Sequence, residues 1–89
     1  MNYIQRIRMA LSNKISVEPQ LLDLYTLLVF TTGVATTLEH VHDAWSVWKN
    51  TINDKHPALI PFSELTKEKQ ELDQEYAAAI IETALQVNQ

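Results

Sequence analysis

The spacing of hydrophobic residues along the chain predicts helices rather than strands. Apolar residues recur about three or four positions apart in most segments, and regular alternation of apolar and polar residues is scarce. The first predicted helix runs from about Tyr3 to Ser12, with Ile4, Ile7 and Leu11 on one face. The pattern as a whole predicts an all-α fold, a small bundle of about four helices.

The second predicted helix begins near Pro19 and ends near Thr32, where Gly33 supplies a left-handed stop. This helix is apolar almost all round, and such a helix must be covered on every side. Either the other helices wrap it as the centre of the core, or its remaining surface forms a homo-oligomer interface. The simplest such oligomer is a two-fold dimer.

A capping box predicts the start of the third helix. In Thr36-Thr37-Leu38-Glu39, the Thr36 hydroxyl would accept a hydrogen bond from the backbone N–H near Glu39, and Glu39 would reach back. We expect this helix to end near Asn50. Its apolar stripe would consist of Leu38, Val41, Trp45, Trp48 and Ile52.

A structured loop connects the last two predicted helices. It spans about Thr51 to Phe62, contains His56-Pro57-Ala58-Leu59-Ile60-Pro61, and ends in a short turn near residues 63–65. Thr66 is the expected N-cap of one continuous helix to about Gln86. One face of that helix would carry Leu72, Tyr76, Ile80, Thr83 and Val87.

Composition limits the class of protein. The 89 residues form one domain, and the absence of cysteine excludes disulfides and thiolate metal sites. The formal charge is −4 with scattered Lys and Arg, which does not fit a nucleic-acid binder. No signal-peptide pattern is present, and the apolar run at 21–30 cannot span about 30 Å of hydrocarbon. We therefore expect a cytoplasmic protein without a membrane partner.

The third helix and the loop hold the candidate chemistry. His42, Trp45 and Lys49 share one side of the helix, and an aromatic platform beside cationic and carboxylate groups suits a nucleotide. A base would stack on indole, cations would meet phosphate, and a carboxylate would hold ribose hydroxyls. The predicted ligand-binding residues are His42, Asp43, Trp45, Trp48, Lys49, Lys55, His56 and Pro61. Two tryptophans at this spacing are also typical of a buried core.

Other chemistry has less support in the sequence. His40 and His42 point to different faces of a helix and no zinc spacing is present, so we expect no metal and no cofactor. For His56 the alternative to ligand contact is a structural role, in which the ring caps the preceding helix or bonds a loop carbonyl. No activated nucleophile or phosphate-binding glycine loop is present, so we expect no enzyme. A nucleotide hydrolase using a His and a carboxylate, such as Asp43 or Asp73, stays an alternative.

The loop resembles a known family. His56-Pro57-Ala58-Leu59-Ile60-Pro61-Phe62-Ser63-Glu64-Leu65 is similar to the His-Pro-x-Leu-Val-Pro-Tyr-Asp-Glu-Leu core of the ryanodine receptor repeat domain. His42-Asp43-Ala44-Trp45 resembles the His-Asn/Asp-x-Trp of the preceding helix in that family. The likeness covers about residues 38–85, and the pair of motifs is also similar to small phage and prophage proteins.

The resemblance implies binding rather than catalysis. It implies a module that binds a nucleotide-derived signalling molecule, such as a cyclic nucleotide or an ADP-ribose derivative. In a phage protein, the implied role is to sequester that molecule in the host cytoplasm and so counter immune signalling. The alternative is a non-catalytic protein-interaction module whose loop and acidic helix dock a partner.

Overall fold

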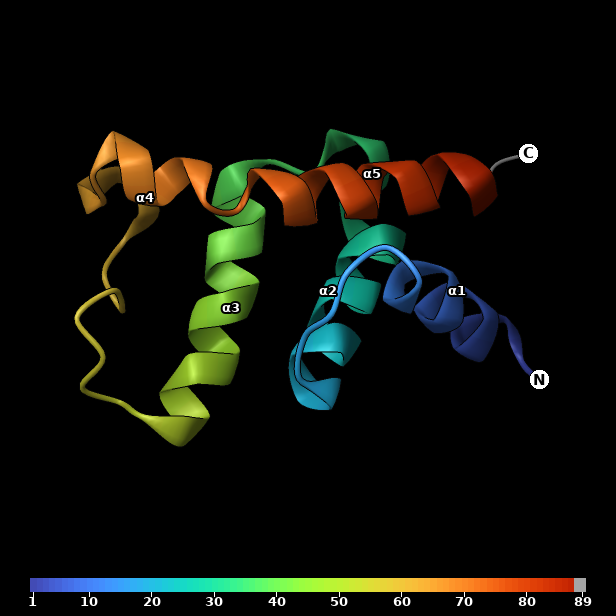
Figure 1. The fold of residues 1–89 in the computed structure, drawn as a ribbon, viewed down its shortest axis with the longest axis horizontal. Helices are drawn as coiled ribbons and strands as arrows, with labels where there is room; N and C mark the ends of the chain where they lie inside the picture. Colours follow the sequence, from blue (N-terminus) through green and yellow to red (C-terminus); the bar gives the residue numbers. More distant parts are fainter. Residues whose placement is uncertain (88–89) are drawn as a thin grey trace.

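The computed structural model describes residues 1–87 and confirms the all-α prediction for this part of the chain (Figure 1). In chain order the elements are α1 (Tyr3–Ser12), α2 (Pro19–Thr31), the 3-10 turn η1 (Gly33–Ala35), α3 (Leu38–Ile52), the 3-10 turn η2 (Phe62–Glu64), α4 (Lys67–Glu71) and α5 (Gln74–Val87). The α4–α5 segment runs along the top of the molecule in Figure 1, and α2 and α3 descend from it. None of these helices has the length and hydropathy needed to cross a membrane.

Local hydrogen bonds set the helix boundaries. Gly33 has φ +53°, as expected for a left-handed stop after α2. The predicted cap at Thr36 is wrong by one residue, because Thr37 accepts the backbone N–H of His40 and the His40 ring bonds the Thr37 backbone. The Thr36 hydroxyl instead donates to the Gly33 carbonyl oxygen at 2.7 Å.

The single fourth helix that the sequence predicts is wrong. Thr66 caps α4 as expected, but the Leu72 N–H turns back to the Lys69 carbonyl at 3.3 Å and ends the helix. Asp73 then accepts the first hydrogen bond of α5, from the Ala77 N–H at 3.0 Å. The break turns Leu72 away from the core, and 71% of this residue is exposed to solvent.

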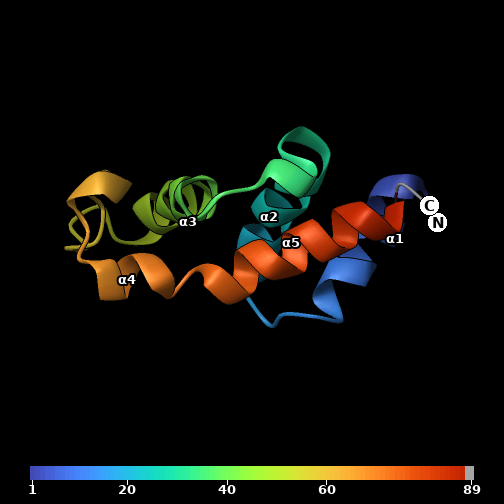
Figure 2. The ribbon, with the colours of Figure 1, turned by 90° about the horizontal axis from the view of Figure 1, so that it is seen from above.

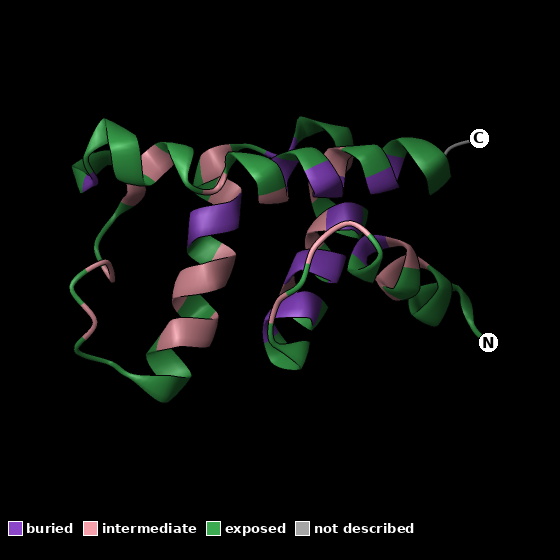
Figure 3. Ribbon diagram, in the orientation of Figure 1, coloured by how far each residue is buried: buried purple, intermediate pink, exposed green. Residues whose placement is uncertain are grey.

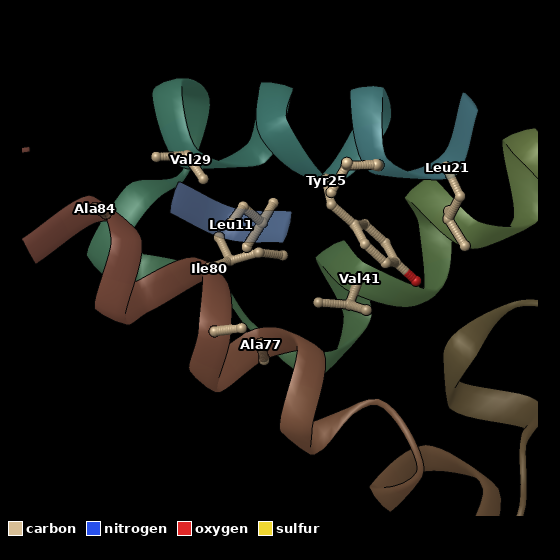
Figure 4. Packing of buried hydrophobic residues seen from close by; sticks show 10 residues of the cluster. Leu11, Leu21, Tyr25, Val29, Val41, Ala77, Ile80 and Ala84 are labelled. Atoms are coloured by element: carbon tan, nitrogen blue, oxygen red, sulfur yellow. The ribbon is translucent and has the colours of Figure 1, made fainter. Parts of the chain in front are cut away.

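The hydrophobic core lies among α1, α2 and α5 and reaches the first turn of α3. Figure 3 shows the buried residues concentrated on these helices, and Figure 2 shows α5 crossing α1 and α2. Figure 4 shows Ile80 of α5 facing Leu11 of α1, with Val41 of α3 nearby. The buried apolar cluster consists of Leu11, Leu21, Leu22, Tyr25, Val29, Val41, Ala77, Ala79, Ile80 and Ala84.

The rest of the chain packs differently. Beyond Val41 and His42, no residue of α3 is buried, and Leu65 is the one buried residue between 53 and 73. Both tryptophans are half-buried. We name α1, α2 and α5 the core region, and residues 42–73 the loop region.

Candidate functional site

The loop region encloses a cavity of about 290 Å³. The chain descends through α3, returns through the loop and continues into α4 (Figure 1), and each of these segments contributes residues to the cavity wall. The junction between α4 and α5 supplies a further part of the wall. The lining residues are His42, Trp45, His56, Ala58, Leu65, Lys69, Leu72 and Asp73.

Three rings form one continuous wall of the cavity. The His42 ring stacks on Trp45, with centroids 5.8 Å apart and planes 23° apart. The His56 ring meets Trp45 edge-on, at a centroid distance of 5.3 Å and an angle of 79°. We refer to His42, Trp45 and His56 as the aromatic wall.

His42 ties the loop to α3. His42 is buried, with only 3% of the residue exposed, and its Nε2–H donates to the Ile60 carbonyl oxygen at 2.8 Å. Ser46 Oγ lies 3.4 Å from the same nitrogen. A carbonyl oxygen can only accept, so this contact fixes the proton of the neutral ring on Nε2 and leaves Nδ1 as an acceptor. No side chain within residues 1–87 bonds Nδ1.

His56 stabilises the loop and also lines the cavity. Its Nδ1 accepts the backbone N–H of Ala58 at 3.0 Å, so the ring proton of the neutral imidazole is on Nε2. The interpretation of His56 as a loop-stabilising residue and its interpretation as a ligand contact are therefore compatible. Its Nε2–H has no partner within the described part of the chain.

Asp73 brings a half-buried carboxylate to the cavity. Burial raises the pKa of this carboxyl group, and positive charge on His42 opposes the rise. Burial raises the pKa of the Tyr25 hydroxyl, and the nearby negative charge of Asp73 raises it further. No hydrogen bond or ion pair joins the Asp73 carboxylate to any residue in 1–87.

Lys69 adds the cation of the lining and is exposed to solvent on α4. Its place in the lining was missed from the sequence, because the alternating Lys and Glu residues of this segment resemble a solvated helix face. Asp73 was considered only as a partner for a hydrolytic histidine. Aspartate is a common N-cap residue, so a second cap residue at Asp73, seven positions after Thr66, is the sequence signal that could have located the break between α4 and α5.

The structure brings only some of the predicted ligand-binding residues together. His42, Trp45 and His56 share the cavity, whereas Asp43 and Pro61 line a separate, more open groove beside α3. Lys49 places its Nζ 5.4 Å from the Trp48 ring centroid, so these two residues contact each other and line neither space. Lys55 is exposed in the loop and also lines neither.

The lining of the cavity is better suited to an organic ligand than to a metal ion. Within residues 1–87, no group of three or more His, Asp or Glu side chains is arranged to hold a metal ion. The lining instead combines aromatic rings with one carboxylate and one ammonium group. Such a lining suits a planar organic molecule that carries polar substituents.

A family model described as a domain of unknown function (DUF7701) matches residues 2–85. This range includes every residue that lines the cavity. No curated protein and no solved structure matches the chain.

Proposed function

Because the chain belongs to the family described as a domain of unknown function (DUF7701), we propose its function from the cavity itself: non-catalytic binding of a nucleotide-derived molecule. The observation that carries this proposal is the aromatic wall, which faces a cavity that also contains Lys69 and Asp73. A nucleobase has a planar face for the wall, and its phosphate has a charge opposite to that of Lys69.

The size of the cavity supports the same class of ligand. At about 290 Å³ it lies just below the usual range of ligand pockets, which is roughly 300–1,000 Å³. A base fits inside such a volume, while sugar and phosphate extend to the exposed ammonium group of Lys69. Molecules with the phosphate at the solvent side therefore fit better than molecules with a buried charge.

The same arrangement favours sequestration over turnover. The buried His42 already uses Nε2 to hold the loop, and the lining contains no Ser or Thr hydroxyl as a nucleophile. In this proposal a phage-encoded copy removes a host nucleotide messenger from an immune effector. The similarity of its His-Pro loop to ryanodine receptor repeats favours the same role.

Isothermal titration calorimetry tests the proposal with a panel of mononucleotides, cyclic nucleotides and ADP-ribose. Binding by one member should weaken about tenfold or more in Trp45→Leu, because stacking on an aromatic side chain contributes roughly 1–3 kcal/mol per base. Lys69→Gln should weaken it less, and Lys67→Gln is the matched control because Lys67 lies on α4 outside the lining. Absence of heat with the whole panel would overturn the proposal.

A second surface supports the predicted homo-oligomer. Leu27 and Phe30 on α2 remain 55% and 40% exposed, and the Tyr3 ring of α1 packs edge-on against Phe30 at 5.6 Å. Ile4 adds to the same patch. We propose that this patch pairs with a second copy of the chain, as adjacent exposed apolar side chains are typical of interfaces.

Light scattering tests the homo-oligomer. The wild type should have the mass of a dimer, or of a higher oligomer, at micromolar concentration. Leu27→Lys should give a monomer, because a charged side chain would lie in the apolar contact. Val47→Lys is the matched control, since Val47 is 60% exposed on α3 outside the patch. A monomeric wild type would rule out the interface.

A further inference from the structure

We propose that Asp73 makes this cavity selective for planar ligands with two adjacent N–H donors on one ring edge, which among the common nucleobases means guanine. The inference rests on the proposed function and names the ligand class of the same site. Two oxygens of one carboxylate can accept two parallel hydrogen bonds, in the way that carboxylates receive the paired donors of arginine.

The position of Asp73 is unusual for its residue type. Its backbone carbonyl accepts the first hydrogen bond of α5, so it occupies the N-cap position, where an Asp side chain commonly accepts a backbone N–H. Here the side chain accepts no hydrogen bond from the first turn of α5 and lines the cavity instead. The carboxylate is therefore available to a ligand.

The groups around Asp73 leave its acceptors unused. His42 faces it from α3, Tyr25 from α2, Glu75 and Tyr76 belong to the first turn of α5, and Lys69 shares the cavity from α4. None of them makes a hydrogen bond or ion pair with the carboxylate within the described residues. Burial raises the pKa of the Asp73 carboxyl group, so its charged form is partly desolvated, and a ligand that supplies N–H donors stabilises that form.

The aromatic wall and Asp73 line the same cavity, and the charge of His42 acts on the Asp73 carboxyl group. In this proposal a base that stacks on the wall presents one ring edge to the carboxylate. Guanine offers N1–H and the 2-amino group there, hypoxanthine offers N1–H alone, and adenine offers a single amino group beside a ring acceptor.

Calorimetry on the wild-type protein tests the selectivity. GMP should bind about ten times more tightly than AMP, with IMP between them, since IMP keeps one of the two parallel hydrogen bonds and AMP brings a ring acceptor against the carboxylate. The 2′-deoxy form dGMP should bind as GMP does. Equal affinity for GMP and AMP, or a large loss with dGMP, would overturn the inference, and the latter would assign Asp73 to the ribose hydroxyls.

A substitution provides an independent test with a gain of binding. Asp73→Asn presents one acceptor and one donor, so GMP should weaken about tenfold while xanthosine monophosphate, which pairs N1–H with a carbonyl oxygen, should strengthen. The gain shows that the variant is folded. A weakening for GMP and AMP alike, without the gain, would contradict the inference.

These results separate the inference from the function on which it rests. If nucleotides bind without preference for guanine, selectivity by Asp73 is wrong and nucleotide binding stands. If none of the nucleotides binds, both proposals are wrong.

Discussion

The core region pairs its buried polar side chains, whereas the loop region leaves some of the polar groups that line its cavity without partners in residues 1–87. In the core region the buried hydroxyls of Thr26 and Thr83 donate to carbonyls of their own helices, at 2.7 and 2.8 Å. In the loop region, His56 Nε2 and the Asp73 carboxylate line a cavity without partners in residues 1–87. Groups that satisfy each other stabilise a fold, whereas groups left without partners are available to a ligand.

The largest effect should come from the core region. Ile80→Ala removes a side chain that is fully buried, and the cavity left behind should lower the free energy of unfolding by about 3 kcal/mol. Thermal unfolding followed by circular dichroism should show a fall in Tm of roughly 15 °C. Leu72→Ala is the control, because Leu72 is 71% exposed and its loss should change Tm little. Equal losses would contradict the assignment of the core to α1, α2 and α5.

An intermediate effect should come from the hydrogen bond between His42 and Ile60, the tether between α3 and the loop. His42→Phe keeps a ring against Trp45 but removes the donor to the Ile60 carbonyl. Loss of this buried hydrogen bond should cost about 1–2 kcal/mol and lower Tm by roughly 5–10 °C.

Hydrogen exchange shows where the effect of His42→Phe lies. The amides of the loop should exchange much faster in the variant. The amides of α5 should exchange faster only by the amount that the lower global stability causes. An unchanged Tm would mean that the tether does not hold the loop.

The smallest effect should come from the charge of Asp73. Because burial raises its pKa, the folded state holds this proton more tightly than the unfolded chain does. The stability from this group is present at low pH and is lost as the pH rises through the folded-state pKa. The Tm of the wild type relative to Asp73→Asn should therefore fall by roughly 1–3 °C between about pH 3 and pH 7, since a half-buried charge stays partly solvated. A difference that rises with pH would contradict the burial of this carboxylate.

Periodicity was enough to predict most of the fold. The ends of α1, the start of α2 and the stop at Gly33 follow from apolar spacing, a first-turn proline and a glycine with positive φ. Ile80 and Thr83 are buried, as the predicted face requires, but Val87 on the same face is 45% exposed, and Ile52 at the end of the predicted α3 stripe is 61% exposed. The predicted cap at Thr36 and the predicted continuous helix through Leu72 are wrong, because local hydrogen bonds decided between neighbouring positions.

The candidate site depended on contacts that sequence spacing does not show. Helical spacing placed His42, Trp45 and Lys49 on one side, but Lys49 turns to the Trp48 ring and leaves the cavity. Lys69 reaches the cavity from α4, and Asp73 reaches it from the junction between α4 and α5. The sequence predicted one continuous helix here, and periodicity does not show where such a helix is interrupted.

The central claim is that a nucleotide occupies the cavity of the loop region, and the two tryptophans test it most directly. Trp45 lines the cavity and Trp48 does not, so a ligand in the cavity should contact Trp45 alone of the two. In a titration followed by ¹⁵N NMR, GMP should shift the indole N–H signal of Trp45 strongly and that of Trp48 little. Signals that do not move, or a shift confined to Trp48, would contradict the account.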